Sequence, residues 1–169
     1  MPYNLPINRT MSAMSIHRSR GFTLIELLVV ISIIGVLSAV VLASLNTARS
    51  KGNDAAIQSD MATIQTEAEI YYGGDGGNTY GAQAWTNGAA CATTAIGVFS
   101  DSIVQRALAG ANSVNGAGDI ACFANNSGYL VAVALTSTAG TYWCVDQTGA
   151  ARKVTATFPT SAPAGNVCP

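Results

Sequence analysis

Side chains that could perform acid–base or nucleophilic chemistry are few in this chain of 169 residues. The only histidine, His17, lies in a basic leader that we expect to be removed, so no Ser–His or Cys–His pair would survive processing. Glu67 and Glu69 are two residues apart on a predicted helix and point to different faces. We therefore expect no catalytic residues, and the sequence does not indicate an enzyme.

One carboxylate has an unusual setting. From Phe22 to Leu45 the chain holds 24 residues, of which only Glu26 is charged. At about 1.5 Å per residue, a helix of this length is about 36 Å long and would cross the hydrocarbon core of a bilayer. A lone carboxylate in such a segment is costly unless it has a partner, so Glu26 is a candidate functional residue.

Basic residues precede the apolar segment, and no acidic residue occurs before Glu26. Arg18 and Arg20 lead to Gly21, a small residue at the junction with Phe22. This arrangement predicts a processed N-terminus that is held in the cytoplasm. An ordinary secretory signal fits poorly, because its cleavage site follows the apolar region. Here the junction precedes the apolar region, and the helix would stay attached after the cut.

Residues 21–27, Gly-Phe-Thr-Leu-Ile-Glu-Leu, together with the basic leader and the apolar helix, resemble the class III signal of type IV pilins and type II secretion pseudopilins. The resemblance is close from about Arg18 to Leu45 and covers the rest only in general layout. It implies that a prepilin peptidase cuts after Gly21 and N-methylates Phe22. It also implies that Glu26 pairs with the N-terminal amine of a neighbouring subunit in a filament.

The resemblance further implies a location and a set of partners. The protein would be a single-pass protein of the cell membrane with a cytoplasmic N-terminus, and would then enter an extracellular or periplasmic filament. Its partners would be prepilin peptidase, an inner-membrane assembly platform, the membrane, copies of itself and other pilins. A type IV pilus and a secretion pseudopilus share every motif, so both stay open. A third alternative is an uncleaved, membrane-anchored binding module.

Charge is sparse outside the leader. Charged residues make up 10% of the chain and the net charge is −1, so nothing indicates a nucleic-acid partner. Arg9, Arg18 and Arg20 precede the apolar helix, whereas Arg49 and Lys51 follow it. This bias favours a cytoplasmic N-terminal side and an exported C-terminal part.

The chain divides into four predicted parts. Residues 1–21 form the leader, whose true start could be Met1, Met11 or Met14. Residues 22–46 form the transmembrane and assembly helix, residues 47–72 continue it as an amphipathic helix, and residues 73–169 form a globular head.

Beyond residue 47 the apolar residues recur on one helix face, at Ile57, Met61, Ile64, Ala68 and Tyr71. We expect this face to pack on a sheet. Gly52-Asn53 is a possible break, with Asp54 as an N-cap where the helix resumes. The helix should end between Gly73 and Gly77, because four glycines in five residues do not sustain a helix.

The last third of the chain shows short β-type runs separated by turn residues, at Ile120–Ala124, Tyr129–Leu135, Thr141–Asp146 and, as a possible fourth, Ala151–Thr157. Before them, Thr79–Ala95 is predicted as an irregular loop and Asp101–Ala109 as a short helix. The predicted fold class is α+β. A long N-terminal helix, transmembrane in its first half, packs its second half on a small antiparallel sheet of three to four strands.

Four cysteines follow the apolar helix, at positions Cys91, Cys122, Cys144 and Cys168. In an oxidising space they would form disulfides, and four cysteines allow three connectivities. If Tyr129–Leu135 is central, Cys122 and Cys144 lie about two strand spacings apart, near 9.6 Å, beyond the limit of about 7 Å for bridged Cα atoms. Among the other pairings we favour Cys91–Cys122 with Cys144–Cys168.

No metal site or cofactor is predicted. Zinc is disfavoured because no two cysteines are close in sequence and no histidine lies near them. Calcium ligands, which some pseudopilins have, could come from the aspartates Asp75, Asp101, Asp119 and Asp146. These aspartates are scattered, however, and roles in turns or helix caps fit them better.

Overall fold

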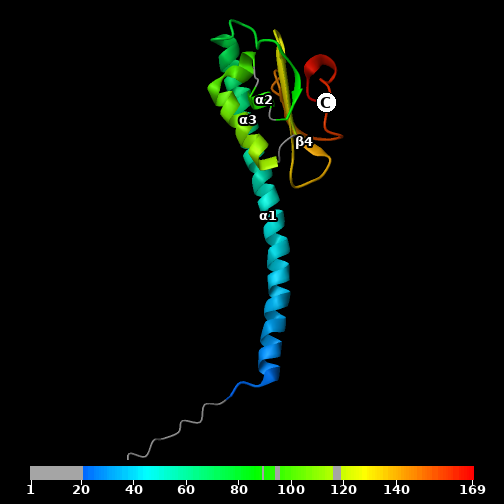
Figure 1. Ribbon diagram of the computed structural model, residues 1–169. Coiled ribbons are helices and arrows are strands. Elements are labelled where there is room, and N and C mark those ends of the chain that lie inside the picture. Colours follow the sequence, from blue (N-terminus) through cyan, green and yellow to red (C-terminus); the bar gives the residue numbers. More distant parts are fainter. Residues whose placement is uncertain (1–20, 89, 94–95, 116–118) are drawn as a thin grey trace, which may run out of the picture. The chain divides into compact units, whose positions relative to one another are not determined.

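The computed structural model describes residues 21–88, 90–93, 96–115 and 119–169 (Figure 1). The predicted leader, apart from Gly21, lies outside the described residues. The chain divides into two compact units, Met1–Val41 and Leu42–Pro169. One helix, α1 (Leu24–Gly73), crosses the boundary between these units.

Helix α1 is continuous over 50 residues. The predicted break at Gly52-Asn53 is wrong, because both residues lie inside the helix. The helix ends where the glycine-rich stretch begins. Beyond its end, the Gly74 amide donates to the Ile70 carbonyl (2.9 Å) and the Gly76 amide to the Tyr71 carbonyl (2.7 Å), so these backbone groups satisfy carbonyls of the last turn.

Within the second unit, one face of α1 lies in the core. Ile57, Met61, Ile64 and Ala68 are completely buried, as their helical spacing predicts, and Tyr71 packs against the core from a half-buried position. Burying a side chain as large as Ile57 or Met61 contributes about 1.5–3 kcal/mol to stability. This part of α1 is therefore fixed by packing as well as by its own backbone hydrogen bonds.

The sheet is an antiparallel meander of five strands, each paired with the next: β1 (Gln83–Asn87), β2 (Ile120–Asn125), β3 (Gly128–Ala134), β4 (Thr141–Asp146) and β5 (Ala151–Thr155). The structure confirms the α+β fold and the four strands predicted from the C-terminal third. Strand β3 is central, and its residues 128–133 are buried on both faces of the sheet.

Strand β1 corrects one prediction, because it lies in the segment Thr79–Ala95 that was expected to be a loop. It pairs with β2 from Gln83, opposite Ala124, to Asn87, opposite Ala121, and the register shifts between Gln83 and Thr86. Only Trp85 and Thr86 in this strand favour β structure by themselves. Pairing with β2, and not local propensity, therefore specifies β1.

Three short or medium helical segments lie between β1 and β2: α2 (Ala90–Thr93), η1 (Gly97–Ser100) and α3 (Ser102–Asn115). Helix α3 is longer than the predicted Asp101–Ala109. The Asp101 carboxylate caps its start, because Oδ1 accepts hydrogen bonds from the amides of Ile103 (2.7 Å) and Val104 (3.1 Å). Helix α3 buries Val104, Ala107, Leu108 and Ala111 in the same core as α1.

Asp54 has a different role from the predicted N-cap. It lies inside α1, is 6% exposed, and accepts hydrogen bonds from the loop between β3 and β4. Oδ1 accepts from the amide (2.6 Å) and hydroxyl (3.0 Å) of Thr136, and the amide and hydroxyl of Ser137 complete the set. A buried carboxylate with this many donors is well compensated, so it ties the loop to the helix.

Two disulfides cross-link the second unit. Cys91–Cys122 joins α2 to β2, and Cys144–Cys168 joins β4 to the C-terminal segment, each with a Cα–Cα distance of 5.8 Å. This is the pairing favoured from the sequence, where the predicted strand order argues only against Cys122–Cys144.

Two glycines allow a close backbone approach in front of η1. Gly81 (φ +92°) and Gly97 (φ +65°) face each other, and a Cβ on Gly97 would lie 2.5 Å from the Tyr80 carbonyl oxygen. The Val98 amide donates to that same carbonyl at 2.9 Å. A side chain at Gly97 would therefore force apart a hydrogen-bonded contact of the backbone.

We predict that Gly97→Ala lowers the free energy of unfolding by at least ~2 kcal/mol, because the backbone is left-handed there and the space is occupied. Gly52→Ala is the matched control. Its Cβ would meet no atom within 4 Å, and it should stabilise the helix by up to about 1 kcal/mol. Urea unfolding in detergent micelles, followed by the fluorescence of Trp85 and Trp143, measures both. Equal stability of the two variants would contradict the prediction.

Candidate assembly site

The first part of α1, with Phe22 just before it, presents an apolar surface that the described part of the chain leaves exposed. Phe22 is 78% exposed, Leu24 79% and Ile31 60%. By length and composition this helix could cross a membrane. An apolar surface of this extent requires a covering environment, which a bilayer or the helices of other subunits would supply.

Thr23 and Glu26 form a capping box at the start of α1. Glu26 Oε2 accepts hydrogen bonds from the Thr23 amide (2.9 Å) and hydroxyl (2.8 Å), while the Glu26 amide donates to the Thr23 hydroxyl (3.2 Å). The reciprocal bonds satisfy backbone donors that a helix N-terminus otherwise leaves open. Glu26 thus has a role within its own chain that the sequence-based interpretation missed. The signal, Thr-x-x-Glu before an apolar run, was present.

The capping box leaves part of the carboxylate available. Among the described residues, Glu26 Oε1 accepts no hydrogen bond, whereas Oε2 is used twice. Glu26 lies on an exposed part of the helix. The carboxylate can therefore cap its own helix and at the same time accept a proton donor or a cation from another molecule.

The predicted cleavage junction lies just before this cap. Gly21 and Phe22 are exposed and precede the first helical residue, Leu24. Among the described residues, apart from its chain neighbour, no atom lies within 4 Å of the position that a Cβ on Gly21 would take. A peptide bond outside regular structure, with free space around it, is accessible to an enzyme that binds extended backbone.

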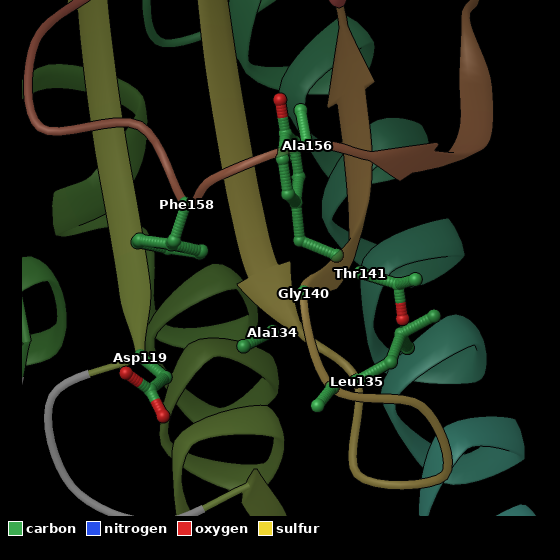
Figure 2. A pocket seen from close by; sticks show the side chains of 9 residues that line it. Asp119, Ala134, Leu135, Gly140, Thr141, Ala156 and Phe158 are labelled. Carbon is green, nitrogen blue, oxygen red and sulfur yellow. The ribbon is translucent and has the colours of Figure 1, made fainter.

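A cavity of about 240 Å³ lies near the start of β4 (Figure 2). Asp119 is the only acidic residue among its described lining residues, and Tyr142 and Phe158 form an aromatic edge-to-face pair with ring centroids 5.7 Å apart. The Thr141 hydroxyl donates to the Thr138 carbonyl (2.7 Å). This lining contains no nucleophile hydrogen-bonded to a base.

The aspartates considered as calcium ligands do not converge. Within the described ranges, no group of three or more His, Cys, Asp or Glu side chains could hold a metal ion. Asp101 caps α3, and Asp146 binds the backbone of Cys168. The four cysteines are consumed in the two disulfides.

The features that converge at one place are thus a glycine junction, a capped carboxylate and an exposed apolar helix. Residues 16–42 match the family described as the prokaryotic N-terminal methylation motif. The resemblance to the type IV pilin family is therefore confirmed at the N-terminal segment that carries it.

A stretch of 55 residues, 32% of the chain, is 40% identical to the type IV wide pilus major component PilA4 of Thermus thermophilus. The matched stretch covers 42% of the length of that relative. No solved structure matches the chain.

We predict that Thr23→Ala frays the start of α1, because it removes both hydroxyl bonds of the capping box. A lost N-cap costs about 1 kcal/mol, so amide exchange at residues 24–27 should accelerate about fivefold. Glu26→Gln is the matched variant, since glutamine can also complete a capping box and should leave exchange close to that of the parent. Hydrogen exchange in micelles measures both. Unchanged exchange in Thr23→Ala would show that the cap does not form in solution.

Proposed function

We propose that this protein is a prepilin, a structural subunit that is cleaved after Gly21, N-methylated at Phe22 and polymerised through α1 into a type IV pilus-like filament. One observation carries the proposal: the glycine junction, the capped Glu26 and the exposed apolar helix occur in a single register. The matched relative is a major pilus component, and for that reason a pilus is preferred to a secretion pseudopilus.

Under this proposal the apolar part of α1 has two successive environments. Residues 1–21 leave as the leader, and residues 22–46 hold the subunit in the membrane until assembly. Prepilin peptidase and an inner-membrane assembly platform act on the subunit at this stage. In the filament the same apolar surface packs on copies of this chain and on other pilins, so it stays out of water throughout.

Glu26 acts between subunits in this scheme. In the membrane it lies one turn from the end of the helix, where water can reach it. In a packed filament the surroundings are dry, and an unpaired carboxylate would cost several kcal/mol. The amine of Phe22 on a neighbouring subunit supplies the cation, while Thr23 keeps the carboxylate oriented. Because every subunit offers its amine at the same height, the pair also fixes the axial register.

The junction itself gives the first test. Gly21→Leu should block cleavage, because a peptidase pocket that accepts glycine has no room for a large side chain, whereas Gly21→Ala should be cut at an intermediate rate. Intact-mass measurement on protein from the native host should find the parent beginning at a methylated Phe22. A leader retained on assembled parent protein, or Gly21→Leu cut at the parent rate, would refute the proposal.

The second test is assembly. Glu26→Gln removes the charge but keeps the cap, so insertion, cleavage and head folding should be normal while filament yield falls at least about tenfold. Glu67→Gln, the same change on the part of α1 within the second unit, is the control and should assemble normally. Filaments are counted by electron microscopy against the membrane pool on immunoblots. Parent-level filament yield in Glu26→Gln would show that apolar packing alone directs assembly.

A further inference from the structure

The C-terminal segment after β5, residues 156–169 and here called the tail, covers the sheet face opposite α3 (Figure 1). Under it lies a separate apolar cluster of Leu130, Ala132, Tyr142, Cys144 and Cys168, to which Phe158 of the tail adds its ring. The tail contains no strand and only one short 3-10 turn, Ala164–Asn166. Side-chain and backbone contacts must therefore hold it in place.

The backbone of Cys168 is held on both sides by charged groups. Its amide donates to Asp146 Oδ2 at 2.6 Å, and its carbonyl accepts from Arg152 Nη2 at 2.5 Å. Neither contact involves the sulfur atom, so both can exist while Cys168 is still a thiol. Hydrogen bonds to charged groups are about twice as strong as those between neutral groups.

Asp146 is oriented without help from the tail. Its other oxygen, Oδ1, accepts from the Thr148 amide (2.8 Å) and hydroxyl (2.5 Å) in the turn between β4 and β5. The side chain is completely buried. Burial alone would raise its pKa, but the hydrogen bonds from Thr148 and Cys168 outweigh burial and hold the pKa of Asp146 below its usual value. The acceptor is therefore charged in the folded protein, and the two bonds from Thr148 orient it independently of the tail.

Asp146 and Cys144 are two residues apart on β4, so their side chains leave the same face of the sheet. A tail whose Cys168 amide is bound to Asp146 consequently has its thiol next to Cys144. Among the described residues, the Cys91–Cys122 bridge has no comparable pair of charged partners. The Cys91 amide donates to the Gly88 carbonyl (3.1 Å), and the Cys91 sulfur lies 3.0 Å from the Thr86 carbonyl oxygen.

We propose that Asp146 and Arg152 form a docking site for the Cys168 backbone, which holds the tail on the sheet before the disulfide closes and so positions Cys168 for pairing with Cys144. The two residues are positioning residues, and they take no part in the exchange chemistry. The inference is independent of filament assembly.

The bond-forming chemistry needs an external oxidant, a disulfide of low molecular weight such as oxidised glutathione. One cysteine thiolate attacks a glutathione sulfur and releases one glutathione, which leaves a mixed disulfide on the protein. The second cysteine thiolate then attacks the protein sulfur of that mixed disulfide and releases the second glutathione. Two electrons and two protons pass from the two thiols to the oxidant. Docking raises the rate and extent of the second step, because the two protein sulfurs are already adjacent.

The test is a redox titration of the full chain in micelles, in glutathione buffers, with alkylation and peptide mass spectrometry of both cysteine pairs. In Asp146→Asn the effective concentration of the Cys144/Cys168 pair should fall about tenfold, as expected for loss of a charge-assisted bond. The Cys91/Cys122 pair is an internal control for folding and should change by less than about twofold. An unchanged Cys144/Cys168 pair, or an equal fall in both pairs, would overturn the proposal.

Two surface variants guard against a folding defect in Asp146→Asn. Arg152 is exposed on the edge strand β5, so Arg152→Gln should leave the core intact and still lower the effective concentration of the Cys144/Cys168 pair severalfold. Lys153 is the next residue on the same strand and has no hydrogen bond to Cys168 among the described residues. Lys153→Gln should therefore leave the effective concentration of the Cys144/Cys168 pair unchanged. Equal behaviour of Arg152→Gln and Lys153→Gln would count against the docking site.

Docking without the disulfide can be observed directly. In the double variant Cys144→Ser/Cys168→Ser, hydrogen exchange of residues 156–169 should stay slower than in the unfolded chain. Adding Asp146→Asn to the double variant should make hydrogen exchange of these residues about tenfold faster. A tail that already exchanges as an unfolded segment in the double variant would overturn the proposal.

Discussion

The structure depends on one helix that must satisfy two different surroundings. In its first part α1 is apolar on every side, and its large side chains are exposed in the isolated chain. In the second unit the same helix buries a single face, formed by Asp54, Ile57, Met61, Ile64 and Ala68. The apolar part requires a membrane or other helices, whereas the amphipathic part requires only a sheet to pack on. A continuous backbone joins the two parts, so a single helix has to meet both requirements.

Buried charge is used sparingly, and where it occurs the donors come from loops. Asp54 accepts hydrogen bonds from the turn after β3. Asp146 accepts hydrogen bonds from the turn between β4 and β5 and from the tail. Each carboxylate replaces its lost hydration with several hydrogen bonds, as burial of an ion demands. Tyr129 shows the contrast. Its hydroxyl is buried with no partner among the described residues, and burial raises the pKa of that phenol. The ring is retained for packing, not for its polar group.

The parts that sequence patterns predicted are those whose information is local. Helical spacing from Ile57 to Ala68 identified the buried face, and glycines marked the end of α1. Strand β1 and the full extent of α3 were not predictable in this way, because pairing with β2 and packing on the core create them. The break expected at Gly52 does not occur, because an exposed glycine costs only about 1 kcal/mol in a helix that the residues on both sides continue. The capping box differs from these elements, because the spacing of Thr23 and Glu26 in the sequence is sufficient to predict it, although it was not among the predictions.

Each face of the sheet carries one disulfide, but the segments that cover the two faces differ in how much apolar surface they bury. Helices α1 and α3 cover one face, and Cys91 and Cys122 lie in that cluster. The other face is covered by a tail rich in proline and small residues, which loses much conformational entropy on ordering and buries few large side chains. Apolar contact alone offsets little of that cost. The hydrogen bonds from Arg152 and to Asp146, together with the disulfide, all act at Cys168, so the segment between β5 and Cys168 is held at both ends.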